Sequence, residues 1–141
     1  MYTFVQSTHS HMRWLIMLTA VLAIVLPMLN QNHSSKSKTP GLVFMIFCDL
    51  QLLLGLLLYF GLSPFGVNSF GAGMSTIMKT PEIRKIVVEH FALMLLAIAM
   101  VHIGYSKIKK ATDQNTVKKL SLKFFGIALV LILLGIPWYK L

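Results

Sequence analysis

The chain has 141 residues, of which 56% are hydrophobic and 12% are charged. A soluble domain usually carries about a quarter charged residues, so this composition excludes an ordinary soluble domain. The apolar residues come in four blocks, each near the ~20 residues that cross ~30 Å of hydrocarbon. We therefore expect an integral membrane protein that forms a single transmembrane domain over residues 1–141.

The basic balance of the chain fits a membrane better than a nucleic acid. The formal net charge is +9, but the lysines and arginines lie in short segments between the apolar blocks. There they set membrane orientation and meet anionic lipid headgroups. No basic stripe interleaved with aromatic residues is present, so we exclude nucleic acid as a partner. Cys48 is the only cysteine and lies within an apolar block, so no disulfide framework is expected.

The first two transmembrane helices are predicted over residues 11–29 and 41–61. The hydroxyl side chains within residues 7–10 offer an N-cap for the first helix. The start of the chain lacks a basic region and a small-residue cleavage site, so we expect this helix to stay in the membrane. Thr39 is the expected N-cap of the second helix, and Pro40 suits its first turn.

The third and fourth transmembrane helices are predicted over residues 83–107 and 120–139. Residues 61–80 are rich in glycine and are expected to form a loop on the membrane surface. Thr80 as a cap and Pro81 at the first helical position mark the start of the third helix. Short linkers favour an all-α, up-down-up-down four-helix bundle.

Basic residues predict the orientation of this bundle. Eight lie in or beside the two linkers at one end of the bundle: Lys36, Lys38, Lys107, Lys109, Lys110, Lys118, Lys119 and Lys123. Five lie at the other end: Arg13, Lys79, Arg84, Lys85 and Lys140. The positive-inside rule then places the linkers in the cytoplasm and both termini outside, as for a protein of the bacterial inner membrane.

The third predicted helix carries Glu89, His90 and His102 within an apolar run. An ionisable group in hydrocarbon costs at least a few kcal/mol unless it faces protein, water or a cofactor. The first and third helices begin on the same side, so His11 and His90 are expected to lie toward one another. Facing histidines on two helices are the usual axial ligands of a b-type haem.

We therefore predict His11 and His90 as metal ligands, with Arg13 near a haem propionate. Glu89 or Asp49 would accept the second N–H group of a ligand histidine. A zinc site built from the same histidines and carboxylates is less favoured, because the chain has no compact ligand motif such as HExxH.

The remaining histidines receive other expectations. His102 lies twelve residues from His90, about 18 Å along a helix, so the two cannot share one iron. A second haem would need a partner for His102 that no other span supplies, so one haem is favoured over two. Alternatively, His102 bonds Asp49 or Gln51 on the second helix. His9 and His33 are expected to be solvated.

Four segments of the chain resemble a known group of proteins. They are HSHMRW (9–14), DLQLLLGLLLYF (49–60), VVEHFALMLLAIAMVHIGYSK (87–107) and GIPWYK (135–140). In their order they resemble small bacterial membrane proteins with four spans that are labelled cytochrome b-like. The resemblance implies haem at His11, at His90 and, as a further position, at His102.

Two functions from different classes follow. The first is a small haem-b protein that carries electrons near the outer face. The second is a cofactor-free accessory subunit of a larger membrane complex, such as a respiratory one. A weaker third reading gives Glu89, His90 and Asp49 a proton-linked role. The expected partners are the lipid bilayer and either other membrane subunits or further copies of the chain. None of these three functions requires the chain itself to be an enzyme.

Overall fold

The computed structural model describes residues 1–29, 35–62 and 66–138. All regular structure in these residues is helical, which confirms the all-α prediction. The first two helical rods are α1 and α2, joined to short segments at either end. Their bounds are α1 (Tyr2–Leu29), η1 (Ser35–Lys38), α2 (Thr39–Leu57) and η2 (Leu58–Leu62).

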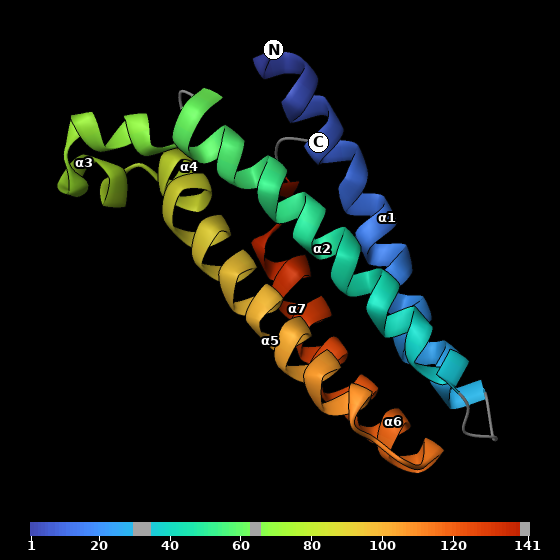
Figure 1. Cartoon of the computed structure of the whole chain (residues 1–141). Coiled ribbons are helices and arrows are strands. Elements are labelled where there is room, and N and C mark those ends of the chain that lie inside the picture. Colours follow the sequence, from blue (N-terminus) through green and yellow to red (C-terminus); the bar gives the residue numbers. More distant parts are fainter. Residues whose placement is uncertain (30–34, 63–65, 139–141) are drawn as a thin grey trace.

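The other two rods each consist of two α-helices joined through a π-helical segment. The third rod contains α4 (Pro81–Arg84), η4 (Lys85–His90) and α5 (Phe91–Lys109). The fourth contains α6 (Gln114–Leu120), η5 (Ser121–Phe125) and α7 (Gly126–Gly135). Between the second and third rods lie η3 (Val67–Ala72) and α3 (Met74–Lys79), to one side of α4 (Figure 1).

The rods lie side by side and alternate in direction (Figure 1). The start of α1 and the end of α7 lie at the same end of the bundle, and α6 lies at the opposite end. Two bonds tie the α6 end together. Gln114 Nε2 donates to the Pro27 carbonyl at 2.9 Å, and Lys38 Nζ donates to the Lys109 carbonyl at 2.8 Å.

The core of the bundle follows a spacing of alternately three and four residues. In α1 the buried positions include Ile16, Ala20, Ala23 and Pro27, and in α5 they include Ala97, Val101, Gly104 and Ile108. This spacing keeps one face of each helix toward its neighbours. Small residues on that face let the helices approach closely, as at Gly104, where a Cβ atom would collide with Phe124.

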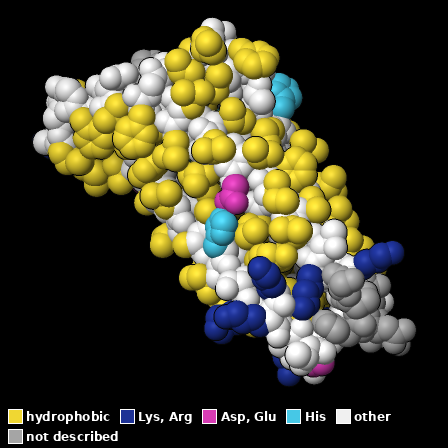
Figure 2. Space-filling model, in the orientation of Figure 1, with side chains coloured by type: hydrophobic (Ala, Val, Ile, Leu, Met, Phe, Trp, Pro, Cys, Tyr) yellow, Lys and Arg dark blue, Asp and Glu magenta, His cyan; other side chains and the backbone are white. Residues whose placement is uncertain are grey.

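Three helices of the described chain are long and apolar enough to cross a membrane: Tyr2–Leu29, Lys36–Leu62 and Pro81–Lys109. Most of the face seen in Figure 2 is hydrophobic, and lysine and arginine side chains gather near the α6 end. Exposed hydrophobic area of this extent suits contact with lipid rather than water.

The fourth predicted span, residues 120–139, is not confirmed. Its helix begins earlier, at Gln114, and ends at Gly135, before Pro137. Lysines at 118, 119 and 123 occupy its first half, which leaves too short an apolar stretch to count as a membrane helix by composition.

Other boundaries also differ from those predicted, since the N-cap residue of α2 is Lys38 and not Thr39. Helix α1 begins at Tyr2, so the hydroxyl groups expected as N-caps lie inside the helix, where Thr8 Oγ1 donates back to the Phe4 carbonyl at 2.9 Å. The expected loop at 61–80 includes η3 and α3. By contrast, Thr80 is the N-cap residue of α4 and Pro81 is in its first turn, as predicted, although the Thr80 hydroxyl bonds the Thr76 carbonyl instead of capping.

Candidate functional site

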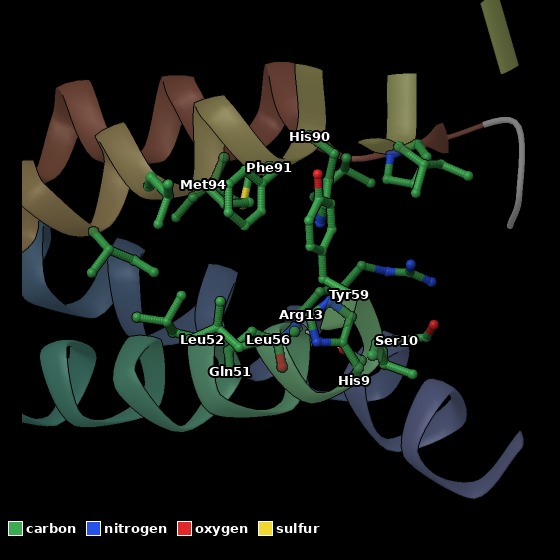
Figure 3. A pocket seen from close by; sticks show the side chains of 18 of the residues that line it. His9, Ser10, Arg13, Gln51, Leu52, Leu56, Tyr59, His90, Phe91 and Met94 are labelled. Atoms are coloured by element: carbon green, nitrogen blue, oxygen red, sulfur yellow. Dashed lines mark hydrogen bonds between the residues drawn. The ribbon is translucent and has the colours of Figure 1, made fainter. Parts of the chain in front are cut away.

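A cavity of about 340 Å³ lies between α1, α2, the third rod and the end of the fourth rod, toward the end that holds the start of α1 (Figure 3). This volume is in the range of small-ligand sites. Most of its wall is aliphatic or aromatic. The labelled polar side chains that line it are His9, Ser10, Arg13, Gln51, Tyr59 and His90.

His90 is the last residue of the π-helical segment η4, and such segments often occur at functional sites. Its Nδ1 atom lies 2.7 Å from the Gly135 carbonyl oxygen. Helix α7 ends at Gly135, so this carbonyl has no partner within the helix. A carbonyl oxygen only accepts, so Nδ1 carries the proton and Nε2 keeps its lone pair. A ligand histidine in a metal site is normally held in this way.

Glycine at position 135 favours this contact. A Cβ atom at this position would collide with the Met94 side chain and would lie 3.2 Å from Leu93 Cβ. The absence of a side chain therefore lets the end of α7 approach the third rod closely enough for His90 to reach it.

His9 reaches the cavity from α1. Gln51 Nε2 donates to the His9 carbonyl at 2.7 Å, which ties α1 to α2 at this level. Gly55 leaves room for the imidazole, because a Cβ atom there would lie 3.3 Å from His9 Cε1. The ring centres of His9 and His90 are 6.2 Å apart, with an angle of 79° between the ring planes.

Three polar atoms in the cavity wall are buried and have no hydrogen-bond partner: His9 Nδ1, Arg13 Nε and Gln51 Oε1. Only Gln114 Oε1 shares this state elsewhere among the described residues. Buried polar atoms are nearly always bonded in folded proteins, so each exception needs an explanation. Three of them around one cavity indicate a ligand that carries polar groups.

The structure does not bring His11 and His90 together. The His11 side chain is exposed, and its Nδ1 atom donates to the Ser7 carbonyl at 2.7 Å on the same helix. His11 does not line the cavity, whereas Arg13 does, as expected. The expectation that His9 is solvated is wrong, because His9 is the α1 histidine that approaches His90. His33 lies outside the described residues.

His102 and the two carboxylates also lie away from the cavity. His102 Nε2 is 2.6 Å from Asp49 Oδ1, which confirms the alternative pairing with the second helix. Glu89 Oε1 accepts from Arg84 Nε at 3.1 Å on the outside of the rod. Neither carboxylate therefore orients the His90 ring. The Gly135 carbonyl oxygen does so instead, by accepting the hydrogen bond from Nδ1.

The helical phase of α1 was the signal that could have found His9. Counting back from Pro27 in alternating steps of four and three residues gives a single inner face. The positions on that face are Pro27, Ala23, Ala20, Ile16, Arg13 and His9. His11 lies two residues, about 200°, from His9 around the helix and so faces outward.

Comparison with protein-family models, curated proteins and solved structures finds no match for this chain. Among the described residues, no group of three or more histidine, cysteine, aspartate or glutamate side chains is arranged to hold a metal ion. A functional reading therefore depends on the cavity and on the two histidines in its wall.

Proposed function

We propose that this chain is a small integral membrane protein that binds one b-type haem between His9 and His90 and carries electrons. The observation that carries the proposal is the 6.2 Å separation of the two ring centres. An imidazole nitrogen lies about 1.1 Å from its ring centre and bonds a metal at about 2.0–2.1 Å. Two imidazoles that bind one metal have ring centres no more than about 6 Å apart, so His9 and His90 lie close enough to hold one iron between them.

The residues present fit a haem in three further respects. The apolar wall suits a flat, apolar macrocycle, and the Arg13 side chain offers an unpartnered donor for a carboxylate. The bond to Gly135 holds the His90 ring with Nε2 free. When bound, haem supplies a one-electron couple, whose potential depends on its axial ligands, hydrogen bonds and burial.

The charge distribution supports a proposed placement in the membrane. The proposed protein lies in a bacterial inner membrane with the lysine-rich α6 end in the cytoplasm. The cavity then lies near the outer face. In this proposal the rod 114–135 would be the fourth span, although its composition alone does not mark it as one, because it runs back along α5 and its outward side chains Ile127, Val130 and Leu134 are apolar. Both termini would be outside.

The first test is a reduced-minus-oxidised visible spectrum of the detergent-purified protein, expressed with haem supplied, followed by a pyridine haemochrome assay. We expect a b-type α-band at about one haem per chain. His9→Ala and His90→Ala should each remove the colour, whereas His11→Ala should keep it. A colourless wild-type protein, or loss of colour only in His11→Ala, would overturn the proposal.

A second candidate is a cofactor-free accessory subunit of a larger membrane complex. The Asp49–His102 pair favours it, because these polar side chains are exposed on a hydrophobic face and suggest a protein neighbour. This function predicts a colourless protein that purifies with larger subunits from its native membrane. The same spectrum therefore separates the two candidates.

A further inference from the structure

Asp49 on α2 and His102 on α5 form an ion pair between two different rods, and it lies on the outside. Their side chains are 42% and 47% exposed, although Asp49 Oδ1 and His102 Nε2 are 2.6 Å apart. Figure 2 shows a histidine against an acidic side chain in the middle of a largely hydrophobic face. The two side chains therefore bond one another but still expose polar atoms on the outside of the bundle.

The depth of the pair makes this exposure costly. His102 lies five residues, about 7.5 Å, along the helix from Lys107, and Asp49 lies eleven residues, about 16 Å, from Lys38. Both lie within the two helices, Lys36–Leu62 and Pro81–Lys109, that are long and apolar enough to cross a membrane. Polar and ionisable groups at such depth almost always face protein or a water-filled cavity rather than lipid.

We propose that a second copy of this chain packs on the face formed by α2 and α5, so that each Asp49 meets the partner's His102. All copies insert in the same direction, so a two-fold axis along the membrane normal leaves the pair at the same depth in both. The acid of one copy then lies opposite the histidine of the other, and the reverse, without any further polar residue. A different protein would need its own complementary pair at that depth.

The surroundings of the pair suit close packing of two copies. Ala99 lies one turn from His102 on α5 and is exposed, so it leaves room for a facing helix. On α2, the exposed side chains Ile46 and Leu53 flank Asp49 by three and four residues. They provide apolar contact on both sides of the polar centre.

The test uses full-length chains with two different tags, in liposomes, and measures dimerisation by energy transfer between labelled copies. Asp49→Ala and His102→Ala each remove both contacts across a homodimer, and each should weaken it by about tenfold. When the two variants are mixed, one Asp49 again faces one His102. The mixed dimer should therefore form more strongly than either homodimer of the variants.

Glu89→Ala is the matched control, because it removes an exposed acid whose pair lies within one rod, and its dimerisation should equal that of the wild type. Circular dichroism reports whether each variant keeps its helical content. A monomeric wild type over a wide range of protein-to-lipid ratios would overturn the proposal. A mixture of Asp49→Ala and His102→Ala that associates no better than either alone would do the same, as would another membrane protein found on this face instead of a copy.

Discussion

Whether a residue lines the cavity depends on which face of its helix it lies on. His9 and His11 are two residues apart, yet His9 faces His90 and His11 faces outward. The same applies on the third rod, where His90 lines the cavity and Glu89, the next residue toward the start, bonds Arg84 on the outside. Residue type alone does not separate these neighbours, but helical phase does.

Gly55 is predicted to be required for haem binding because it makes room for the His9 ring. Even a Cβ atom added at position 55 would lie only 3.3 Å from His9 Cε1. The larger side chain of leucine would therefore push the imidazole out of its position opposite His90. We expect Gly55→Leu to weaken haem binding about 10–100-fold, the usual range when a ligand loses its support. Haem titration followed by the visible spectrum measures this. Gly61→Leu, at an exposed position on the same rod, is the control and should bind normally.

Arg13 is predicted to contribute charge rather than ligation. Its Nε atom is buried in the cavity wall without a partner. Hydrogen bonds to charged groups contribute about 1.5–3 kcal/mol, so Arg13→Gln should lower haem affinity by roughly ten- to a hundredfold. The wavelength of the α-band should stay unchanged, because the two histidines that we propose to hold the haem remain. An affinity equal to that of Arg84→Gln, which alters an arginine outside the cavity, would contradict this role.

The long helices could be predicted from the apolar blocks of the sequence, but only some of their boundaries carry a reliable local signal. Thr80 and Pro81 mark the start of the third rod, and they do so in the structure. The start of α1 was missed because Ser7, Thr8 and Ser10 resemble caps, yet α1 already begins at Tyr2.

The site was half predictable for a similar reason. His90 and Arg13 stand out as polar residues in apolar runs, but recognition of His9 requires the inner face of α1. The α2 residues Gln51 and Gly55 belong to the site only through the packing of α2 against α1. No local pattern in the sequence announces that contact.

Close approach between the third and fourth rods predicts opposite effects at two glycines. A Cβ atom on Gly104 would collide with Phe124, whereas one on Gly126 meets nothing within 4 Å. Gly104→Ala should therefore lower the free energy of unfolding. Gly126→Ala should raise it by about 0.4–1 kcal/mol, because alanine loses less conformational entropy in a helix. Thermal unfolding in detergent, followed by circular dichroism, compares the two. Equal shifts in Tm would show that the packing of α5 on η5 does not depend on Gly104.

At the scale of the whole molecule, charge and hydrophobicity are segregated along the bundle. Lysine and arginine side chains gather near the α6 end (Figure 2), and residues near the start of α1 line the cavity at the other end. If the lysine-rich end lies in the cytoplasm, as we propose, the cavity lies toward the outer side, and the proposed dimer face lies between the two ends. The C-terminus lies on the same side of the membrane as the cavity only where the rod 114–135 crosses the bilayer. The first half of this rod carries three lysines, so the crossing needs a test.

The side of the C-terminus therefore tests both the orientation and the fourth span. We expect a reporter fused to the C-terminus to be active only outside the cytoplasm, and one fused after Lys110 to be active only inside. The reason is that 114–135 runs antiparallel to α5, which brings Gly135 to within hydrogen-bond distance of His90. A C-terminal reporter on the same side as the Lys110 fusion would mean that 114–135 does not cross the bilayer. The rod would then have to place its lysines differently, and the Gly135 carbonyl would no longer accept a hydrogen bond from His90. Replacement of Lys118, Lys119 and Lys123 by glutamine should leave the C-terminal reporter outside. The reason is that the lysines at 107, 109 and 110, at the end of α5, should still keep the α6 end in the cytoplasm.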